Sequence, residues 1–239
     1  MLRKVFSFLQ NVNNTNKIYE NDAVNNDVEF KYLTKERKNK KLKEIFSNLP
    51  RFETERLILR RIENMDYADM FEYSADPDVT KYLTWKPHEK IEDTKDYIVG
   101  LQKRYDSGKF FDWGLVCRED GRFIGTCGFT SINIVQNTCE VGYVLSKKYW
   151  GRGYMTEALE CVMDFAFNYF GFYKVEARFI EGNINSQKVM QKMGMLYERV
   201  NKNALHVKGE YKNVHTYTIT IDEFENRKKA LNKTVVNVT

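Results

Sequence analysis

Residues 149–158 read Tyr-Trp-Gly-Arg-Gly-Tyr-Met-Thr-Glu-Ala, and this stretch decides how the chain folds. It joins a strand-like run, Glu140 to Leu145, to a long amphipathic helix. Two glycines at a strand-to-helix turn let backbone N–H groups come close to a ligand, and the helix N-terminus adds about half a positive charge at the same place. The stretch therefore predicts a pyrophosphate cradle, with an ordinary structural turn as the alternative.

The residues around these glycines exclude two other phosphate-binding loops. A P-loop needs a lysine after its second glycine, and none follows here at that spacing. A dinucleotide-binding fingerprint needs a third glycine where Thr156 stands. The helix that follows favours a ligand-binding turn, because its apolar residues recur at i, i+3, i+4 and i+7 before Gly171 ends it. This face comprises Met155, Ala158, Leu159, Val162, Met163, Ala166 and Phe170.

The cradle resembles the acetyl-CoA loop of the GCN5-related N-acetyltransferase (GNAT) superfamily, whose pattern is Q/R-x-x-G-x-G/A. Trp150 stands at the first position of this pattern, Gly153 at the fourth and Met155 at the last. A tryptophan is usual in the RimJ/RimL-type branch, which acetylates ribosomal-protein N-termini and reads W-G-x-G-Y-A-T-E-A, so Met155 replaces an alanine. The run E-T-E-R-L-x-L-R, which ends at Arg60, resembles the opening of the same branch.

The resemblance covers Phe52 to Ile221 and implies both a fold and a cofactor. It implies an α/β (α+β mixed-sheet) architecture, the GNAT-like acyl-CoA N-acyltransferase fold, with about seven strands flanked by helices. It also implies a bacterial, cytoplasmic transferase that uses acetyl-CoA and no metal. The expected division is an N-terminal extension over 1–50, partly helical or disordered, an acetyltransferase domain over 51–224, and a C-terminal tail over 225–239.

Local patterns along the chain agree with helices flanking a mixed sheet. Alternating or apolar runs predict strands near 52–60, 113–118, 123–134, 138–145, 174–180, 195–200 and 214–221. Helical periodicity and capping residues predict helices near 31–46, 65–73, 77–83, 94–107, 154–170 and 184–193.

Composition and charge exclude several other classes of protein. The chain has 239 residues, of which 42% are hydrophobic, and it lacks an apolar run long enough for a membrane helix. Residues 51–239 carry 28 Lys/Arg and 27 Asp/Glu, so we expect no direct nucleic-acid binding by the main domain and no membrane association. The basic run from Lys35 to Lys43 either contacts RNA or a ribosome or forms a solvated helix face. Four cysteines without metal-site spacing fit reduced thiols in a cytoplasm.

Acetyl transfer to an amine requires a base, and Glu140 is the candidate. It lies in an otherwise apolar strand that leads to the cradle, and by alternation it shares a face with Gly142 and Val144. Partial burial would raise the pKa of its carboxyl and suit it to accept a proton through a water. Glutamate is frequent at this place in the resembled branch. The alternative is a strand glutamate that is salt-bridged or exposed at an edge.

The departing thiolate requires a proton, and the segment from Asn183 onward is similar to the family's pantetheine-binding stretch. Many members have a tyrosine acid where Met190 stands, and a methionine cannot donate a proton. Ser186 is then the candidate donor, with helix capping as its alternative role. Lys192 either contacts a cofactor phosphate or is solvated. The predicted cofactor-binding residues are Tyr143, Val144, Leu145, Trp150, Gly151, Arg152, Gly153, Tyr154, Met155, Thr156, Asn183, Ser186 and Lys192.

The acceptor is the least defined part of the prediction. Tyr82, Trp85 and the loop from Asn201 to Asn213 are candidate walls of its site. The leading hypothesis is acetylation of a protein N-terminal amine. A small amine, such as a polyamine, an amino sugar or a toxic amino acid analogue, is the second. A catalytically silent acyl-CoA-binding or ribosome-associated module is the third, and a homodimer is an open possibility for each.

Overall fold

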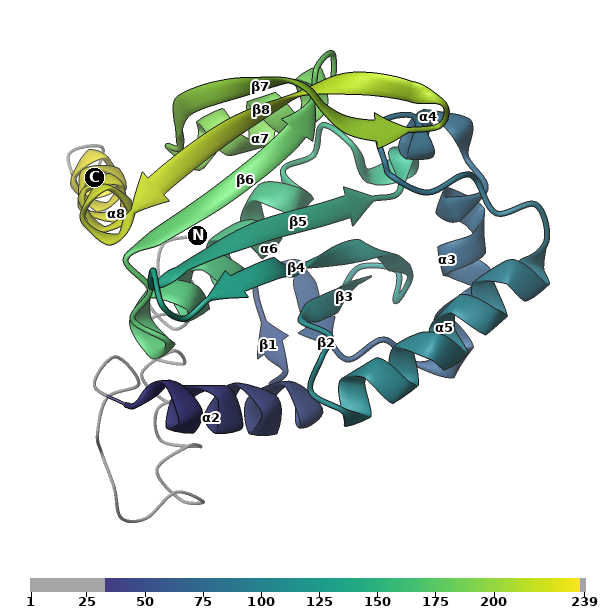
Figure 1. The fold of residues 1–239 in the computed structure, drawn as a ribbon, viewed down its shortest axis with the longest axis horizontal. Coiled ribbons are helices and arrows are strands. Elements are labelled where there is room, and N and C mark those ends of the chain that lie inside the picture. The colour runs from purple at the N-terminus through teal and green to yellow at the C-terminus, as the bar shows by residue number, and fades with distance from the viewer. Residues whose placement is uncertain (1–32, 237–239) are drawn as a thin grey trace.

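The computed structural model describes residues 33–236, and one mixed β-sheet forms its centre (Figure 1). The strands lie in the order β1-β2-β3-β4-β5-β6-β8-β7. Neighbouring strands are antiparallel except β5 and β6, which are parallel. The strands are β1 (Phe52–Glu53), β2 (Leu57–Arg60), β3 (Asp112–Cys117), β4 (Phe123–Asn133), β5 (Thr138–Leu145), β6 (Lys174–Ile180), β7 (Leu196–Val207) and β8 (Glu210–Thr220).

The mixed architecture confirms the predicted fold class, but the sheet has eight strands rather than about seven. The difference arises where one strand was expected from Phe52 to Arg60. The chain turns back there, because the Thr54 N–H donates to the Leu57 carbonyl (2.9 Å), and β1 then pairs with β2.

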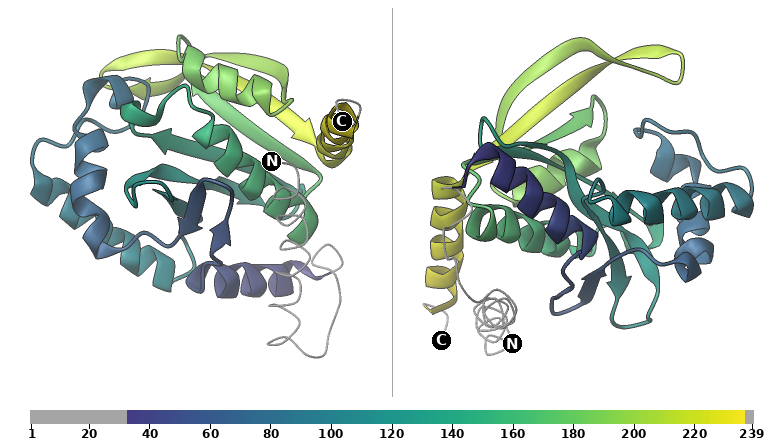
Figure 2. Two further views of the ribbon diagram at one scale, coloured as in Figure 1. Left: turned by 180° about the vertical axis from the view of Figure 1, so that it is seen from behind. Right: turned by 60° about the horizontal axis from the view of Figure 1, so that its bottom comes forward.

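The predicted loop between Asn201 and Asn213 is wrong, because β7 and β8 form one long hairpin through this region. Its two-residue turn is Lys208–Gly209, and both residues have positive φ angles, 53° and 84°. Such a turn matches the twist of the paired strands. Lys-Gly is a weaker turn signal than Asn-Gly, which explains why the sequence indicated two shorter strands joined by a loop rather than this tight turn. Figure 2 shows the hairpin rising away from the rest of the sheet.

Helices cover the two faces of the sheet unequally. The back face, seen in the left view of Figure 2, carries α6 and α7. On the front face, turned toward the viewer in Figure 1, α3 and α5 pack over the half of the sheet that contains β2, β3 and β4. The helical elements are α2 (Lys35–Ser47), η2 (Asn64–Asp66), α3 (Tyr67–Ser74), α4 (Pro77–Thr80), α5 (Ile91–Asp106), η3 (Lys147–Tyr149), α6 (Tyr154–Asp164), η4 (Phe165–Tyr169), α7 (Ile184–Lys192) and α8 (Ile221–Val236).

The main core lies between the back face and α6. The structure confirms the predicted apolar face of this helix, because all seven of its residues are buried. Regular α-helix ends at Asp164, and a π-helical turn, η4, continues to Tyr169. Gly171 follows with a φ of +63°, as expected for a helix stop.

Helices α2 and α8, which precede and follow the sheet in the chain, both pack against this core. Phe46 of α2 is fully buried and contacts the rings of Phe111, Phe129 and Phe170. Helix α8 continues across position 224, where the predicted domain ends, and buries Phe224. The predicted helix from residue 31 begins at Lys35 among the described residues. Within residues 33–236, none of the helices has the length and apolar character of a bilayer span.

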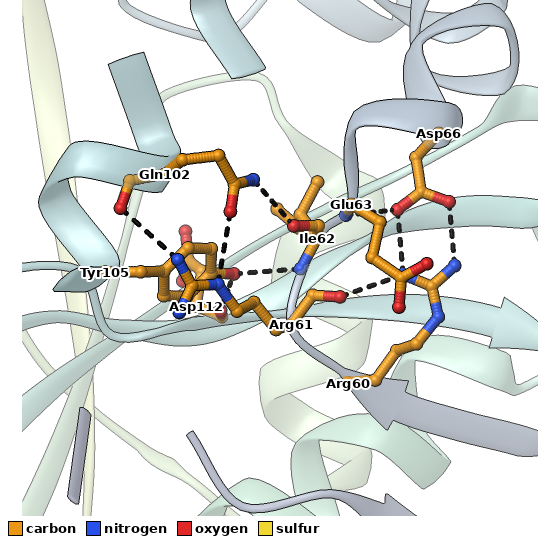
Figure 3. A network of polar contacts seen from close by, with 8 residues as sticks. All are labelled: Arg60, Arg61, Ile62, Glu63, Asp66, Gln102, Tyr105 and Asp112. Carbon is orange, nitrogen blue, oxygen red and sulfur yellow. Dashed lines mark hydrogen bonds and ion pairs between the residues drawn. The ribbon is translucent and has the colours of Figure 1, made fainter. Parts of the chain in front are cut away.

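A polar network holds α5 against the sheet (Figure 3). The Tyr105 hydroxyl accepts from the Ile62 N–H (3.2 Å) and donates to the Asp112 carbonyl (2.7 Å). Arg60 pairs with Asp66 through two short bonds, 2.8 and 2.7 Å, at the start of the neighbouring helical turn. The Tyr105 contacts fix the beginning of β3 relative to α5, and the Arg60–Asp66 pair fixes the end of β2 relative to η2.

Glu157, in the first turn of α6, joins the cradle to the β1–β2 turn. Its carboxylate accepts from the Thr54 hydroxyl (2.6 Å), the Arg56 N–H (2.8 Å) and the Arg56 Nε (2.7 Å). The Arg56 guanidinium also donates to the Arg152 carbonyl (2.8 Å) and lies over the Tyr154 ring, 4.5 Å from its centroid. The two stretches that resemble the same family, far apart in sequence, therefore bind one another directly.

Replacing Glu157 tests this junction. Glu157→Gln keeps the side-chain shape but removes the charge that three donors share, and only 18% of the side chain is exposed. We expect the free energy of unfolding to fall by about 1–3 kcal/mol, which lowers Tm by about 2–4 °C per kcal/mol in a thermal melt. The exposed neighbour variant Glu55→Gln is the control and should change stability by less than about 0.5 kcal/mol. Equal Tm values for the two variants would contradict the junction.

Candidate active site

A pocket of ≈ 350 Å³ lies where the end of β5, the cradle, α7 and the α4 region meet. Thirteen predicted site residues line it, whereas Glu140, Trp85 and Arg152 do not. The predicted residues that line it are Tyr82, Tyr143, Val144, Leu145, Trp150, Gly151, Gly153, Tyr154, Met155, Thr156, Asn183, Ser186 and Lys192.

The pocket opens where β5 separates from β6. These parallel strands pair only from Thr138 to Val141, whereas β5 continues to pair with β4 as far as Leu145. Backbone groups of a strand point alternately to its two sides. The stretch from Gly142 to Leu145 therefore presents backbone groups toward the pocket that no neighbouring strand uses.

The cradle has the backbone geometry that its glycines predict. Gly151 and Gly153 take positive φ angles, 76° and 84°, and Gly153 is the N-cap of α6. A side chain at Gly151 would meet open space, so the backbone conformation, not crowding, requires glycine there. The N–H groups of the first helical turn have no partner within a helix and face the pocket end of α6. This arrangement suits a phosphate group.

Neighbouring side chains hold the cradle in place. Trp150 donates its indole N–H to the Leu145 carbonyl (2.7 Å), which ties the cradle to the end of β5. The Met155 side chain is buried in the core and only borders the pocket. The core therefore accommodates this side chain, which is longer than the alanine of the resembled branch. The Arg152 guanidinium instead lies toward the Tyr149 ring, 5.9 Å from its centroid.

Helix α7 brings its first turn to the same pocket. The Asn183 side chain caps the helix by accepting from the Ser186 N–H (3.2 Å). The Ser186 side chain is therefore not the cap, and it lines the pocket. Tyr143 donates its hydroxyl to the Ser186 carbonyl (3.1 Å) and so spans the gap from β5 to α7. Burial raises the pKa of this phenol well above its ordinary value. Met190 is buried in the core.

Glu140 lies on the front face beside the pocket. Its neighbours Cys139 and Val141 point into the back-face core, so alternation places Glu140 on the opposite side. The carboxylate forms an ion pair with Arg178 of β6 (2.7 Å), and 15% of the Glu140 side chain is exposed. The salt-bridged alternative is thus present in the structure, on the same strand that would carry the thioester.

On the side of the pocket that holds Tyr82, the predicted acceptor residue, contacts join distant segments of the chain. Tyr82 lines the pocket close to Gly182, whose φ is +91°. At the hairpin tip, Lys208 donates to the Thr80 carbonyl (2.6 Å) at the end of α4. Trp85 lies outside the pocket and contacts the His88 ring at 5.5 Å.

Sequence reasoning missed several pocket residues, and most of them come from segments far from the cradle. Lys188 lies one turn before Lys192 on α7, so helical spacing could have identified it. The residues around α4 carried no such signal, because only the tertiary fold brings them to the cradle. The missed residues are Asp78, Val79, Lys81, Leu83, Tyr149, Asn185, Lys188 and Val189.

These residues fit acetyl-CoA. The glycine turn and the N-terminal end of α6 suit a pyrophosphate, and the gap beside β5 suits an extended amide-containing arm. Lys81, Lys188 and Lys192 line the same pocket and add positive charge to it. Among residues 33–236, no group of His, Cys, Asp and Glu side chains is arranged to hold a metal ion.

Comparisons with known proteins agree with this site. The family model described as acetyltransferase (GNAT) domain matches residues 56–196. N-acetyltransferase p20 of Bacillus licheniformis, an uncharacterized protein, is 28% identical over 171 residues, which cover 72% of this chain and 96% of that protein. The ribosomal protein uS5-alanine N-acetyltransferase of Escherichia coli is 26% identical over 179 residues, which cover 70% of this chain and 89% of the enzyme.

Solved structures show the same fold. A GNAT-family acetyltransferase from Bacillus anthracis superposes with a TM-score of 0.64 at 25% identity and covers 72% of this chain and 98% of its own. A RimL ribosomal-protein acetyltransferase in complex with coenzyme A has a TM-score of 0.62 at 19% identity. This match covers 73% of the present chain and 99% of the RimL chain. With the cradle, the divergent strands and the family match in agreement, the chain belongs to the GNAT acetyltransferase family and is an N-acetyltransferase.

Proposed function

We propose that this enzyme moves an acetyl group from acetyl-CoA to a primary amine, and that the amine is a protein N-terminus of the ribosomal-protein type. The observation that carries the proposal is the pocket itself, in which the cradle, the unpaired edge of β5 and the start of α7 meet. The similarity to the uS5-alanine N-acetyltransferase supports a protein N-terminus as acceptor.

Different parts of the site bind the cofactor and act on its thioester. Acetyl-CoA supplies an activated acyl group when bound. The α6 N-terminus and the cradle bind its pyrophosphate, with Lys81, Lys188 and Lys192 nearby. The backbone N–H groups of Tyr143 and Leu145, which alternate away from β4, orient the pantetheine arm and stabilise negative charge on the thioester oxygen.

Two side chains carry out the proton transfers. Glu140 accepts the proton that the amine loses as its nitrogen attacks the carbonyl carbon. Ser186 donates to the sulfur as the carbon–sulfur bond breaks, and solvent is the alternative donor. Ser186 suits this role because its side chain lines the pocket beside Asn183 and the cap is made by Asn183 instead.

Two other functions remain as alternatives. A small amine would use the same chemistry, and the contact between Lys208 and Thr80, which joins the hairpin tip to α4, supports an acceptor site bounded by these two segments. A silent acyl-CoA-binding module would need the same cradle without transfer.

We also propose a cytoplasmic location, because all four cysteines are buried, unpaired thiols. We further propose a homodimer, because Leu196 and Tyr197 of the edge strand β7 are exposed hydrophobic residues. Analytical sedimentation would measure this oligomeric state.

An acetyl-transfer screen tests the function. The amines are peptides that begin with Ala or Ser, spermidine and glucosamine, with free coenzyme A measured as product. We expect the N-terminal peptides to give the highest kcat/KM, and acetyl-CoA to raise Tm by mass action. Faster turnover of spermidine or glucosamine would select the small-amine function. A cofactor-dependent Tm shift without transfer to any amine would select the silent module.

The base is tested by Glu140→Gln. The amide cannot accept the proton, so kcat should fall by about 10²–10⁴-fold while the Tm shift caused by acetyl-CoA is kept. Glu176→Gln, at the position of β6 that pairs with Glu140, is the matched control and should retain most activity. Equal kcat values for the two variants would remove Glu140 from the mechanism.

The proton donor is tested by Ser186→Ala in the same assay. If kcat is unchanged in this variant, solvent and not Ser186 supplies the proton to the thiolate.

A further inference from the structure

The proposed chemistry does not use the basic run from Lys35 to Lys43. In the structure this run lies on α2, and one side of the helix packs on the main core through residues such as Phe46. The opposite side is exposed and carries Arg37, Lys40 and Lys43. Residues three apart are neighbours on a helix surface, so these three cations lie in one row. The fold therefore gathers the charge of the run on one outward face.

The C-terminal end of α5 extends this face. A Cβ at Gly108, just after α5, would collide with the Lys43 backbone, and the Ser47 hydroxyl donates to the Asp106 carbonyl (3.4 Å). Figure 1 shows α2 and the end of α5 next to one another along the lower edge of the molecule. Residues 35–47 and 103–109, named here the basic patch, contain nine Lys/Arg and three Asp/Glu. The formal charge of this patch, +6, exceeds the +5 of the whole chain.

The positive charge of the patch is not neutralised within the part of the chain that the structure describes. Elsewhere, arginines of the domain pair with carboxylates, as Arg56 does with Glu157. Within residues 33–236, by contrast, no ion pair joins a carboxylate to Arg37, Lys40 or Lys43. Like charges three or four positions apart destabilise a helix, so the patch keeps a repulsion that a bound anion would relieve. The same lack of an ion pair applies to Lys35, Lys103 and Lys109.

Helix stability does not explain the cations of α2. A helix N-terminus favours anions and a C-terminus favours cations. The first turn of α2 nevertheless contains Lys35 and Arg37, which Glu36 only partly offsets, and its last turn contains no basic residue. Helix α5 has the ordinary arrangement, with acidic residues in its first turn and basic residues in its last. The charges of α2 are therefore placed against the needs of the helix, which favours a role in binding.

The composition of the patch distinguishes between classes of anionic partner. A helix that lies on a membrane inserts an apolar face into the lipid, but the apolar residues of α2, among them Leu42 and Phe46, face the core. Protein interfaces are rich in aromatic residues at their centre, and no side chain of the patch is an exposed large hydrophobic one. A surface of cations alone suits the phosphates of a nucleic acid, which are bound mainly through charge.

We propose that the basic patch binds the phosphate backbone of RNA without reading its sequence. None of the patch residues lines the pocket, so bound RNA leaves the acetyl-transfer site free. Helix α2 also lies outside residues 56–196, which match the family model, so this surface is an addition to the domain. The choice of RNA rests on the proposed function, because an acceptor of the ribosomal-protein type lies beside RNA. The patch then holds the enzyme close to such acceptors.

The test measures binding of a labelled short RNA duplex to the full chain by fluorescence anisotropy, without acetyl-CoA. At physiological ionic strength we expect a Kd of about 10⁻⁶–10⁻⁴ M, with the logarithm of the binding constant falling linearly with the logarithm of salt concentration. The triple variant Arg37→Gln, Lys40→Gln, Lys43→Gln should bind about tenfold more weakly. Its salt slope should be smaller by about 2–3, because each lost phosphate contact removes about one.

The matched control removes three positive charges elsewhere. Its substitutions, Lys86→Gln, Lys202→Gln and Lys229→Gln, are at exposed lysines outside the patch and the pocket. This variant should keep the affinity and the salt slope of the wild type, and both triple variants should keep its Tm. Equal losses of RNA affinity in the two variants would show that net charge and not the patch controls binding, and would overturn the proposal. A wild-type chain that binds no RNA at low salt would also overturn it.

Vesicles of phosphatidylcholine and phosphatidylglycerol are the second probe. Binding to these vesicles without binding to RNA would assign the patch to a membrane surface and contradict the proposal. Failure of the proposed function is distinguishable, because RNA binding is measured without cofactor or amine. An enzyme that acetylates N-terminal peptides but binds no RNA contradicts only this inference, whereas one that binds RNA and acetylates no amine contradicts the proposed function.

Discussion

The shared carboxylate of Glu157 is the interaction on which the rest of the site depends. It accepts from Thr54 and from two donors of Arg56, and Arg56 in turn binds the Arg152 carbonyl inside the cradle. The β1–β2 turn, the cradle and the first turn of α6 thereby form one unit. A glycine-rich turn is flexible by composition, so such a side-chain anchor is what gives its N–H groups a fixed direction.

The second constraint is the separation of β5 from β6. A parallel pair that stops at Val141 leaves the end of β5 with backbone groups on one side free. Tyr143 crosses this gap to Ser186, so the opening is held at a set width by a hydrogen bond between its two walls. The pocket lies on one side of β5, and Glu140 and Gly142 lie on the front face of the same strand.

The parts of this molecule that follow from local pattern could be predicted, and the parts that depend on long-range packing could not. The apolar period after Gly153 fixed which face of α6 is buried, and the Asn183 cap fixed where α7 begins. The two last strands were predicted, but their tight turn at Lys208–Gly209 was missed, because its residues are a weak local signal. The contribution of Lys81 and Val79 to the pocket was missed because no periodicity links α4 to the cradle.

The central claim is that the cradle and the free edge of β5 hold acetyl-CoA. The most direct measurement is amide hydrogen exchange, resolved by residue, with and without acetyl-CoA. The account predicts that the N–H groups of Tyr154, Met155 and Thr156, together with those of Tyr143 and Leu145, become protected when acetyl-CoA binds. Binding that leaves these amides unprotected, while slowing exchange elsewhere in the sheet, would contradict it.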